Sequence, residues 1–223
     1  KSHSFFSAIA QQHPMLISGW QEIVQNEDGT VSKYAFPSTQ AAHVWVWETS
    51  RDKQGLKGIP HAAKLAESNY PVVLAFADDI YFDHAYTPDK WEPGLRWAGS
   101  FHDTSAALQS SLDATRTEDL ISPNYKHNLS GIEAALWSEN IPTFEHLSYM
   151  ALPKMAGLAE AAWANKTNTT SGNDKINWQS LAIRLGDGHK GFLNFINRIT
   201  GMKYRGYPHG ITLELPEDFH SGQ

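Results

Sequence analysis

The chain has 223 residues, of which 41% are hydrophobic and 19% charged, with 18 basic and 24 acidic residues and a formal net charge of −6. This composition is typical of a globular protein long enough to form a substantial core, and its scattered basic residues argue against nucleic acid as the main partner. There is no cysteine, which excludes disulfides and cysteine-based zinc sites, and no apolar run approaches the roughly 20 residues that a membrane span requires.

The first part of the chain predicts helices that alternate with short strands. The helices are Phe5–Gln12 and Ile59–Ser68, the second with a proline near its start. Apolar and β-prone runs predict strands at Met15–Trp20, Ala42–Glu48 and Val72–Ala77. Residues 78–83 either continue the third strand or form the loop at its end.

The remainder predicts a long irregular segment, residues 85–104, rich in proline, glycine and tryptophan, and such loops are often functional. A fourth strand is expected at Ile132–Trp137, followed by a helix over Phe144–Ala164 that Pro153 kinks or breaks. The alternation favours a parallel α/β arrangement. The remaining features are a polar linker at Asn165–Asp174, a helix at Trp178–Ile199 interrupted near residues 186–188, and an irregular tail from Tyr204.

Two short stretches pair an aromatic ring with a carboxylate, Tyr81-Phe82-Asp83 and Trp137-Ser138-Glu139. Side chains two residues apart on a strand point to the same side, so each stretch would present a flat apolar ring beside an acid. This pairing suits a sugar, which has apolar C–H faces and a rim of hydroxyls. The strand ends Ser18-Gly19-Trp20 and Trp45-Val46-Trp47-Glu48 repeat the theme, and sites in parallel α/β folds gather at the carboxyl ends of strands.

Other polar residues have simpler interpretations. Glu22 and Glu48 are expected as solvated strand-end residues or salt-bridge partners. Asp78-Asp79 could form a metal site or an acid pair, but a polar loop before Tyr81 is the favoured interpretation. No cofactor and no metal are expected, since the histidines lack ligand spacing and are assigned surface or structural roles, among them His43, His84 and His102.

Six motifs in order resemble the C-terminal part of the family 20 glycoside hydrolase catalytic domain, found in β-N-acetylhexosaminidases and chitobiases. They are GWQE, VWVWE, VVLAFADDIYFD, EPGLRWAG, GIEAALWSE and YMALPKMAGLAEAAW. The resemblance implies an α/β fold that is the C-terminal half of a TIM (β/α)8 barrel, strands five to eight plus closing helices. Residues 1–164 would form this half, and residues 165–223 a linker, a C-terminal helix and a tail that pack on the barrel.

The family mechanism is substrate-assisted and retaining: the 2-acetamido oxygen of the sugar attacks the anomeric carbon, and no enzyme nucleophile forms a covalent bond. An Asp-Glu pair at the end of strand four orients the acetamido group and supplies the general acid. This sequence contains no Asp-Glu dipeptide. The pair is therefore expected outside this chain, and the chain alone is expected to be inactive.

The resemblance assigns sugar-binding roles to six residues of this chain. Tyr81 would donate a hydrogen bond to the acetamido carbonyl, and Asp83 and Glu139 would bind outer hydroxyls, at the 4- and 6-positions. The tryptophans that would enclose the acetamido methyl and stack on the ring are Trp20, Trp47 and Trp137. Trp45 is the alternative to Trp47, and Trp97 is a candidate for a second sugar site.

The expected partners are an oligosaccharide containing N-acetylhexosamine, such as chitobiose, and either a missing N-terminal barrel half or a second copy of this chain. No nucleic acid and no membrane are expected as partners. The alternative function is a non-catalytic sugar-binding or structural fragment. The resemblance and the absence of cysteine favour a bacterial periplasmic or secreted location, while the compartment itself stays open.

Overall fold

The computed structural model describes residues 2–53, 55–98, 101–163, 176–186 and 190–206. The chain divides into two compact units. One consists of Lys1–Asp79 and Asp113–Glu133, and the other of Ile80–Leu112 and Ala134–Gln223.

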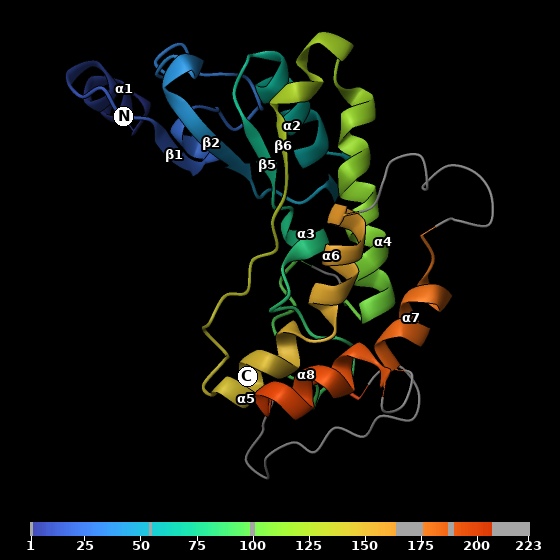
Figure 1. Ribbon diagram of the computed structural model, residues 1–223. Helices are drawn as coiled ribbons and strands as arrows, with labels where there is room; N and C mark the ends of the chain where they lie inside the picture. The colour runs from blue at the N-terminus through green and yellow to red at the C-terminus, as the bar shows by residue number, and fades with distance from the viewer. Residues whose placement is uncertain (1, 54, 99–100, 164–175, 187–189, 207–223) are drawn as a thin grey trace. The chain divides into compact units, whose positions relative to one another are not determined.

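The first unit is built on a four-stranded sheet with the strand order β1-β2-β5-β6 (Figure 1). Every neighbouring pair is parallel, which confirms the predicted α/β arrangement. The strands are β1 (Ile17–Trp20), β2 (Ala41–Val46), β5 (Val72–Leu74) and β6 (Leu129–Ile132).

Short helices and one hairpin surround this sheet. The predicted helices appear as α1 (Ser2–Gln12) and α2 (Gly58–Glu67), and an antiparallel pair joins β3 (Arg51–Asp52) to β4 (Gly55–Leu56). Between β1 and β2, where the sequence showed no helix, the structure has only 3-10 turns. These and two later 3-10 helices are η1 (Gln21–Ile23), η2 (Ser38–Gln40), η3 (Arg116–Leu120) and η4 (Pro123–Asn128).

The sheet of the first unit has two unlike faces. Val44, Val46 and Leu74 are fully buried and pack in one cluster with residues of α2 such as Leu65. Alternate strand residues point the other way, and there Trp45 lies in register with Trp20 and is only partly buried. Parallel sheets are usually buried on both faces, so this half-open second face is unusual for the class.

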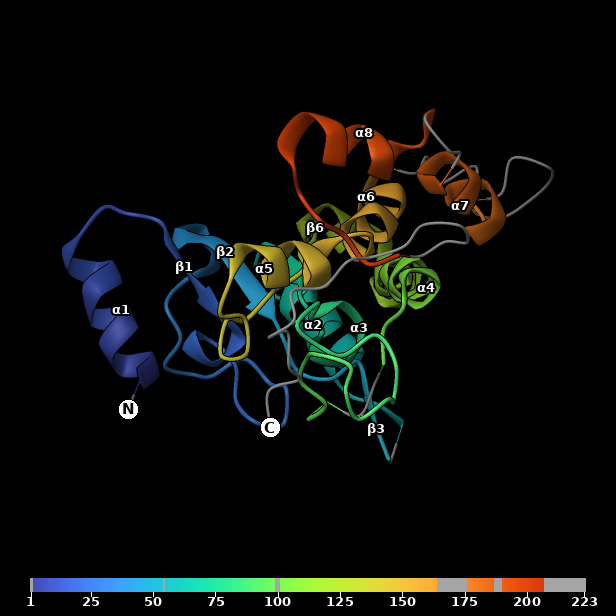
Figure 2. The same cartoon turned by 90° about the horizontal axis from the view of Figure 1, so that it is seen from below.

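The second unit is mainly helical (Figure 2). The predicted helix over residues 144–164 is broken at Pro153, as expected, and the side chain of Thr143 caps its first half by accepting the N–H of His146 at 3.1 Å. On the second half, Glu160 pairs with Arg184 at 2.5 Å. The helices are α5 (Phe144–Ala151), α6 (Lys154–Trp163), α7 (Trp178–Gly186) and α8 (Phe192–Thr200).

A helix that the sequence did not indicate, α4 (Thr104–Thr115), runs from the second unit into the first. Within the second unit it packs closely on α6 at Gly157. A Cβ atom added there would lie 2.8 Å from the backbone nitrogen of Leu108. A glycine is therefore needed at this crossing, because any side chain would push the two helices apart.

The fourth strand was predicted in the wrong place. It spans Leu129–Ile132 instead of Ile132–Trp137, and beyond it only an isolated bridge joins Ala135 to Tyr81. The neighbouring strand β5 ends at Leu74, and the chain then turns into a short helix, α3 (Ala77–Ile80). The segment after Ile132 thus lacks a continuous partner strand, so its apolar run cannot form a ladder.

The same short helix overturns two further expectations. Residues 78–80 neither extend the third strand nor form a polar loop, since Ala77–Ile80 is helical, whereas residues 81–83 form an isolated bridge and a turn. Tyr81-Phe82-Asp83 and Trp137-Ser138-Glu139 therefore lie outside strands, and the argument from strand alternation is wrong for both. The predicted linker Asn165–Asp174 and most of the tail lie outside the described residues, and Tyr204–Gly206 has no regular structure.

Candidate functional site

In the first unit, three tryptophans lie at the carboxyl ends of β1 and β2. Trp20 is the last residue of β1, and its ring centroid lies 6.3 Å from that of Trp45. Trp47 comes directly after β2, whose last residue is Val46. The rings of Trp20 and Trp45 thus lie close together, and Trp47 is placed by hydrogen bonds of its own.

Trp47 is held by the segment that follows β1. Its backbone N–H donates to the side-chain oxygen of Gln21 at 3.0 Å, and its indole N–H donates to the carboxylate of Glu22. The indole N–H of Trp47 is therefore already bonded within the protein. Glu22 is thus a hydrogen-bond partner and not merely a solvated strand-end residue.

The next residue, Glu48, is a salt-bridge partner, one of its two expected roles. Its carboxylate pairs with His61 and lies 3.3 Å from the ammonium of Lys57. Burial raises the pKa of Glu48, but hydrogen bonds from Gln21 and His61 and the charges of His61 and Lys57 together lower it below its usual value. Glu48 therefore anchors the end of β2 as a carboxylate.

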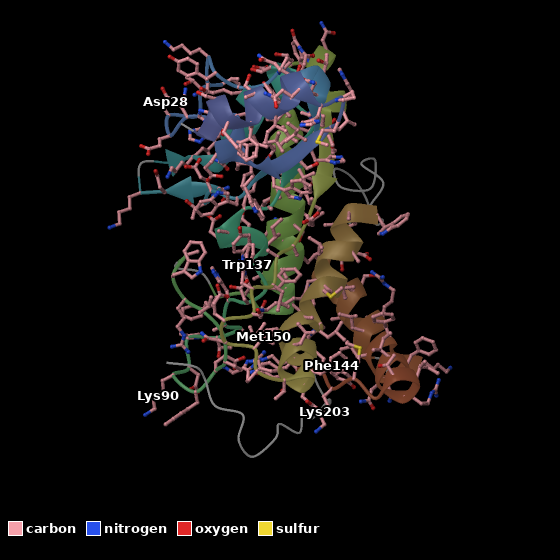
Figure 3. All side chains as sticks on the ribbon, turned by 90° about the vertical axis from the view of Figure 1, so that its left-hand side faces the viewer. Asp28, Lys90, Trp137, Phe144, Met150 and Lys203 are labelled. Carbon is pink, nitrogen blue, oxygen red and sulfur yellow. The ribbon has the colours of Figure 1, made fainter. Side chains whose placement is uncertain are left out.

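The second unit brings together four of the predicted residues. The ring of Tyr81 lies 5.7 Å from that of Trp137 and 6.2 Å from that of Trp97, in both cases edge to face. The carboxylate of Asp83 accepts the backbone N–H of Trp137 at 3.3 Å. Tyr81 and Asp83 are buried, whereas Trp97 and Trp137 are 55% and 39% exposed, so the tryptophans form an accessible aromatic surface over a buried phenol and acid. Figure 3 labels Trp137.

The last predicted residue, Glu139, is exposed on the segment that follows Trp137. Its charge contributes to the electrostatics of Asp83, whose pKa is raised chiefly by burial. The N–H of Trp137 and the charge of Lys154 act in the opposite direction. The charge of Glu139 is thus the smallest of the effects that raise the pKa of Asp83.

Histidines surround this cluster in a structural role. His84 and His102 are buried and stack with their centroids 6.2 Å apart, and the ring of Trp97 lies 5.5 Å from that of His84. Burial, with a contribution from Lys154, lowers the pKa of His84 to about 4, so this imidazole is neutral at physiological pH. Among the residues that the structure describes, no three His, Asp or Glu side chains are grouped so that they could hold a metal ion.

The sequence analysis missed the residue that lies under this cluster, Lys154. Its side chain is fully buried, and its ammonium donates to the backbone carbonyls of Phe82 and His84. One local signal was available: a lysine placed directly after Pro153, in the first turn of a helix that is otherwise mostly small and apolar. Nothing in the sequence indicates which carbonyls it would reach.

The Asp78-Asp79 pair belongs to the first unit and has a structural role there. Asp78 accepts hydrogen bonds from the backbone and hydroxyl of Ser50 at 2.6 and 2.9 Å. The pKa of Asp79 is raised to about 6 by burial and by the charges of Asp78 and Asp113, against the opposing effects of Ser50 and Arg51. The ionised form of Asp79 is therefore less stable in the folded state than in the unfolded chain.

Replacing Asp79 with Asn should stabilise the chain near pH 8 and have little effect near pH 4. The pKa of Asp79 is about 6 when folded and 3.8 in the reference state, so stability is lost as the pH rises between these values. Asparagine removes that loss, which corresponds to about 3 kcal/mol of unfolding free energy. Urea unfolding at both pH values measures it, with the exposed Asp119→Asn as the matched control; equal stabilisation at both would contradict the assignment.

Comparison with solved structures identifies the class of fold. The chain superposes with a TM-score of 0.63 on a GH20 exo-β-N-acetylglucosaminidase from Vibrio harveyi in complex with N-acetylglucosamine, at 22% identity, covering 91% of this chain and 27% of that one. A GH20 β-N-acetylhexosaminidase from Streptomyces coelicolor gives the same score at 23% identity, covering 91% and 35%. The parallel α/β sheet thus belongs to a TIM-barrel-like fold.

The chain belongs to glycosyl hydrolase family 20, whose catalytic-domain model matches residues 3–166. It is 30% identical over 203 residues to a beta-hexosaminidase from Vibrio vulnificus, covering 83% of this chain and 22% of that protein. It is also 30% identical over 161 residues to a beta-N-acetylhexosaminidase from Cellulomonas fimi, covering 71% and 27%. The chain thus spans about a quarter of the length of these curated relatives.

No helix in the described part of the chain is long and apolar enough to cross a membrane.

Proposed function

We propose that this chain is part of a β-N-acetylhexosaminidase that releases terminal β-linked N-acetylhexosamine from chitobiose-like oligosaccharides. The proposal depends chiefly on the cluster of Tyr81, Asp83 and Trp137, in which a phenol and a buried acid lie beside an accessible indole. Family membership supports it, as do the names of the relatives, which include an N,N'-diacetylchitobiase from Vibrio harveyi.

The cluster suits the two sides of an N-acetylated sugar. The indole of Trp137 offers an apolar face to the acetamido methyl and the ring, and the phenol of Tyr81 offers a donor to the acetamido carbonyl. Asp83 and Glu139 are assigned to outer hydroxyls, and Trp97 to a second sugar. Trp20 and Trp47 complete the proposed set, with Trp45 as the alternative to Trp47.

We further propose that the chemistry is substrate-assisted. The acetamido oxygen attacks the anomeric carbon, and Tyr81 holds the carbonyl in line for this attack. The Asp that orients the amide and the Glu that protonates the leaving oxygen are assigned to polypeptide outside this chain, because the chain has no Asp-Glu dipeptide.

The same proposal treats this chain as the C-terminal half of the barrel. A closed TIM barrel needs eight strands, and the parallel sheet of the first unit has four. Its second face, which carries Trp20 and Trp45, is only partly buried, as the inner face of an incomplete barrel would be. An N-terminal barrel half or a second copy of this chain is the partner assigned to that face.

The test is an assay of two polypeptides with 4-nitrophenyl N-acetyl-β-D-glucosaminide. This chain alone is expected to show no turnover, because it lacks the general acid. The product of the full upstream reading frame is expected to hydrolyse the substrate. Turnover by the chain alone would refute the external acid, and binding of N-acetylglucosamine without hydrolysis by the longer product would favour the non-catalytic alternative. Sedimentation of the chain alone shows whether it self-associates or remains a monomer.

A further inference from the structure

Lys154, the first residue of α6, is a fully buried lysine in the second unit. A lysine is seldom fully buried, since removing an ammonium from water costs several kcal/mol unless the new surroundings replace its hydrogen bonds. The surroundings of Lys154 do so with an unusual set of partners. Its ammonium donates to the carbonyl of Phe82 at 3.0 Å and to that of His84 at 2.5 Å.

These two carbonyls flank Asp83 on either side. One cation therefore binds the backbone directly before and directly after the acid assigned to the sugar. Asp83 in turn accepts the N–H of Trp137 at 3.3 Å, and the ring of Trp137 packs on Tyr81. The contacts form a continuous path from Lys154 through the turn at residues 82–84 to the aromatic surface.

Lys154 is itself held by the ring of Tyr86, whose centroid lies 3.9 Å from the ammonium. The hydroxyl of Tyr86 donates to the carbonyl of Tyr149 at 2.8 Å, in the helix that precedes Lys154. The guanidinium of Arg205 also lies over the Tyr86 ring, at 4.5 Å, and pairs with Glu92 at 3.3 Å. The Tyr86 ring, which is itself fixed through its hydroxyl, thus packs on the ammonium.

The charges around Lys154 come from every segment packed on it. The pKa of Lys154 is lowered to about 7, chiefly by burial and also by Arg205, against the opposing effects of Asp83, Glu92 and Asp103. The charge of Lys154 in turn acts on its neighbours: it opposes the rise in the pKa of Asp83 that burial causes, and it adds to the lowering of the pKa of His84. The ammonium thus interacts electrostatically with the side chain of Asp83, which is proposed to bind the sugar, and donates hydrogen bonds to the backbone on either side of Asp83.

We infer that Lys154 is a positioning residue, which holds the turn around Asp83 so that Asp83, Trp137 and Tyr81 keep the geometry needed to bind the sugar. That this positioning serves sugar binding rests on the proposed function. The positioning itself can be measured on the chain without sugar. The ammonium of Lys154 donates hydrogen bonds to two carbonyls, and methionine, a neutral side chain of similar length without an N–H donor, cannot replace them.

The test compares Lys154→Met and Lys154→Arg with Lys203→Met, a control at an exposed lysine of the same unit (Figure 3). The readout is the ¹H–¹⁵N spectrum of the chain without sugar, observed at the backbone and indole N–H of Trp137. Wild type and Lys203→Met should show a Trp137 amide that titrates near pH 7, the pKa of Lys154. In Lys154→Met both Trp137 signals should shift and the titration should vanish.

Arginine keeps the charge but cannot lose its proton, so Lys154→Arg should retain a single Trp137 signal with no midpoint near neutrality. This variant also decides the matter if Lys154→Met fails to fold. A midpoint that persists in Lys154→Arg, or Trp137 signals unchanged in a folded Lys154→Met, would overturn the inference.

In the longer polypeptide, Lys154→Met should lower kcat/KM by roughly 10- to 100-fold, because a small misplacement of binding groups costs rate on this scale. Lys154→Arg should recover much of the loss, and no recovery would count against a positioning role for the cation. The spectra require no sugar. Failure of the longer polypeptide to hydrolyse the substrate would therefore defeat the proposed function and leave the result for Lys154 intact.

Discussion

Replacing Tyr81 with Phe is expected to lower kcat of the longer polypeptide about 100-fold, the loss typical when a reacting group is misplaced by about 1 Å. In the proposed mechanism the phenol aligns the attacking acetamido oxygen, so removal of its hydroxyl would leave the nucleophile poorly oriented. The edge-to-face packing of the ring on Trp97 and Trp137 should survive, since only the hydroxyl is removed.

The measurement is kcat and KM with 4-nitrophenyl N-acetyl-β-D-glucosaminide, beside a thermal melt of each variant. Tyr34→Phe is the matched control, because Tyr34 is 56% exposed and lies in the other unit. A Tyr81→Phe variant that melts normally and keeps its kcat would remove Tyr81 from the catalytic proposal. A rise in KM alone would reduce its role to ground-state binding.

Replacing Gly94 with Ala should destabilise the second unit by about 4 kcal/mol, because backbone strain and steric overlap add at one position. Gly94 has φ +121°, and a Cβ there would lie 2.6 Å from the nitrogen of Ala85 and 2.8 Å from the carbonyl oxygen of Asp83. The next residue, Leu95, donates to that same carbonyl at 2.7 Å and accepts from Ala85 at 3.0 Å. Backbone hydrogen bonds thus join the long loop to residues 83–85 at a point where only glycine fits.

Urea unfolding followed by tryptophan fluorescence gives the change in unfolding free energy. Gly201→Ala is the control, since Gly201 also has positive φ, +70°, but a Cβ there meets open space. It should cost only about 1 kcal/mol, the strain of the left-handed region. Equal losses in the two variants would show that the close approach to Asp83 contributes nothing.

Much of the local structure could be predicted from the sequence. The break at Pro153, the helix α2 and the parallel arrangement follow from proline geometry, apolar periodicity and the alternation of elements, all of which act over a few residues. The family could also be predicted, because six ordered motifs carry more information than any one of them. These features depend on which residues are neighbours in the chain.

Prediction from the sequence failed where the secondary structure of a segment depends on which other segment lies beside it. The apolar run after Ile132 looks like a strand, but it has no continuous strand beside it once β5 ends at Leu74. Tyr81 and Asp83 were predicted to share a face by strand alternation. Instead, the ring of Tyr81 packs edge to face on that of Trp137, and the carboxylate of Asp83 accepts the backbone N–H of Trp137.

The sequence by itself determined which residues are candidates for binding a sugar: the indoles, the phenol and the acids at the ends of the expected strands. Only the tertiary structure decided how they are held, with Glu22 on the indole of Trp47 and Lys154 on the carbonyls beside Asp83. The physical reason is that residue type sets the chemistry a side chain can perform. The position and pKa of that side chain depend on groups 25 or 72 residues away, which no local pattern encodes.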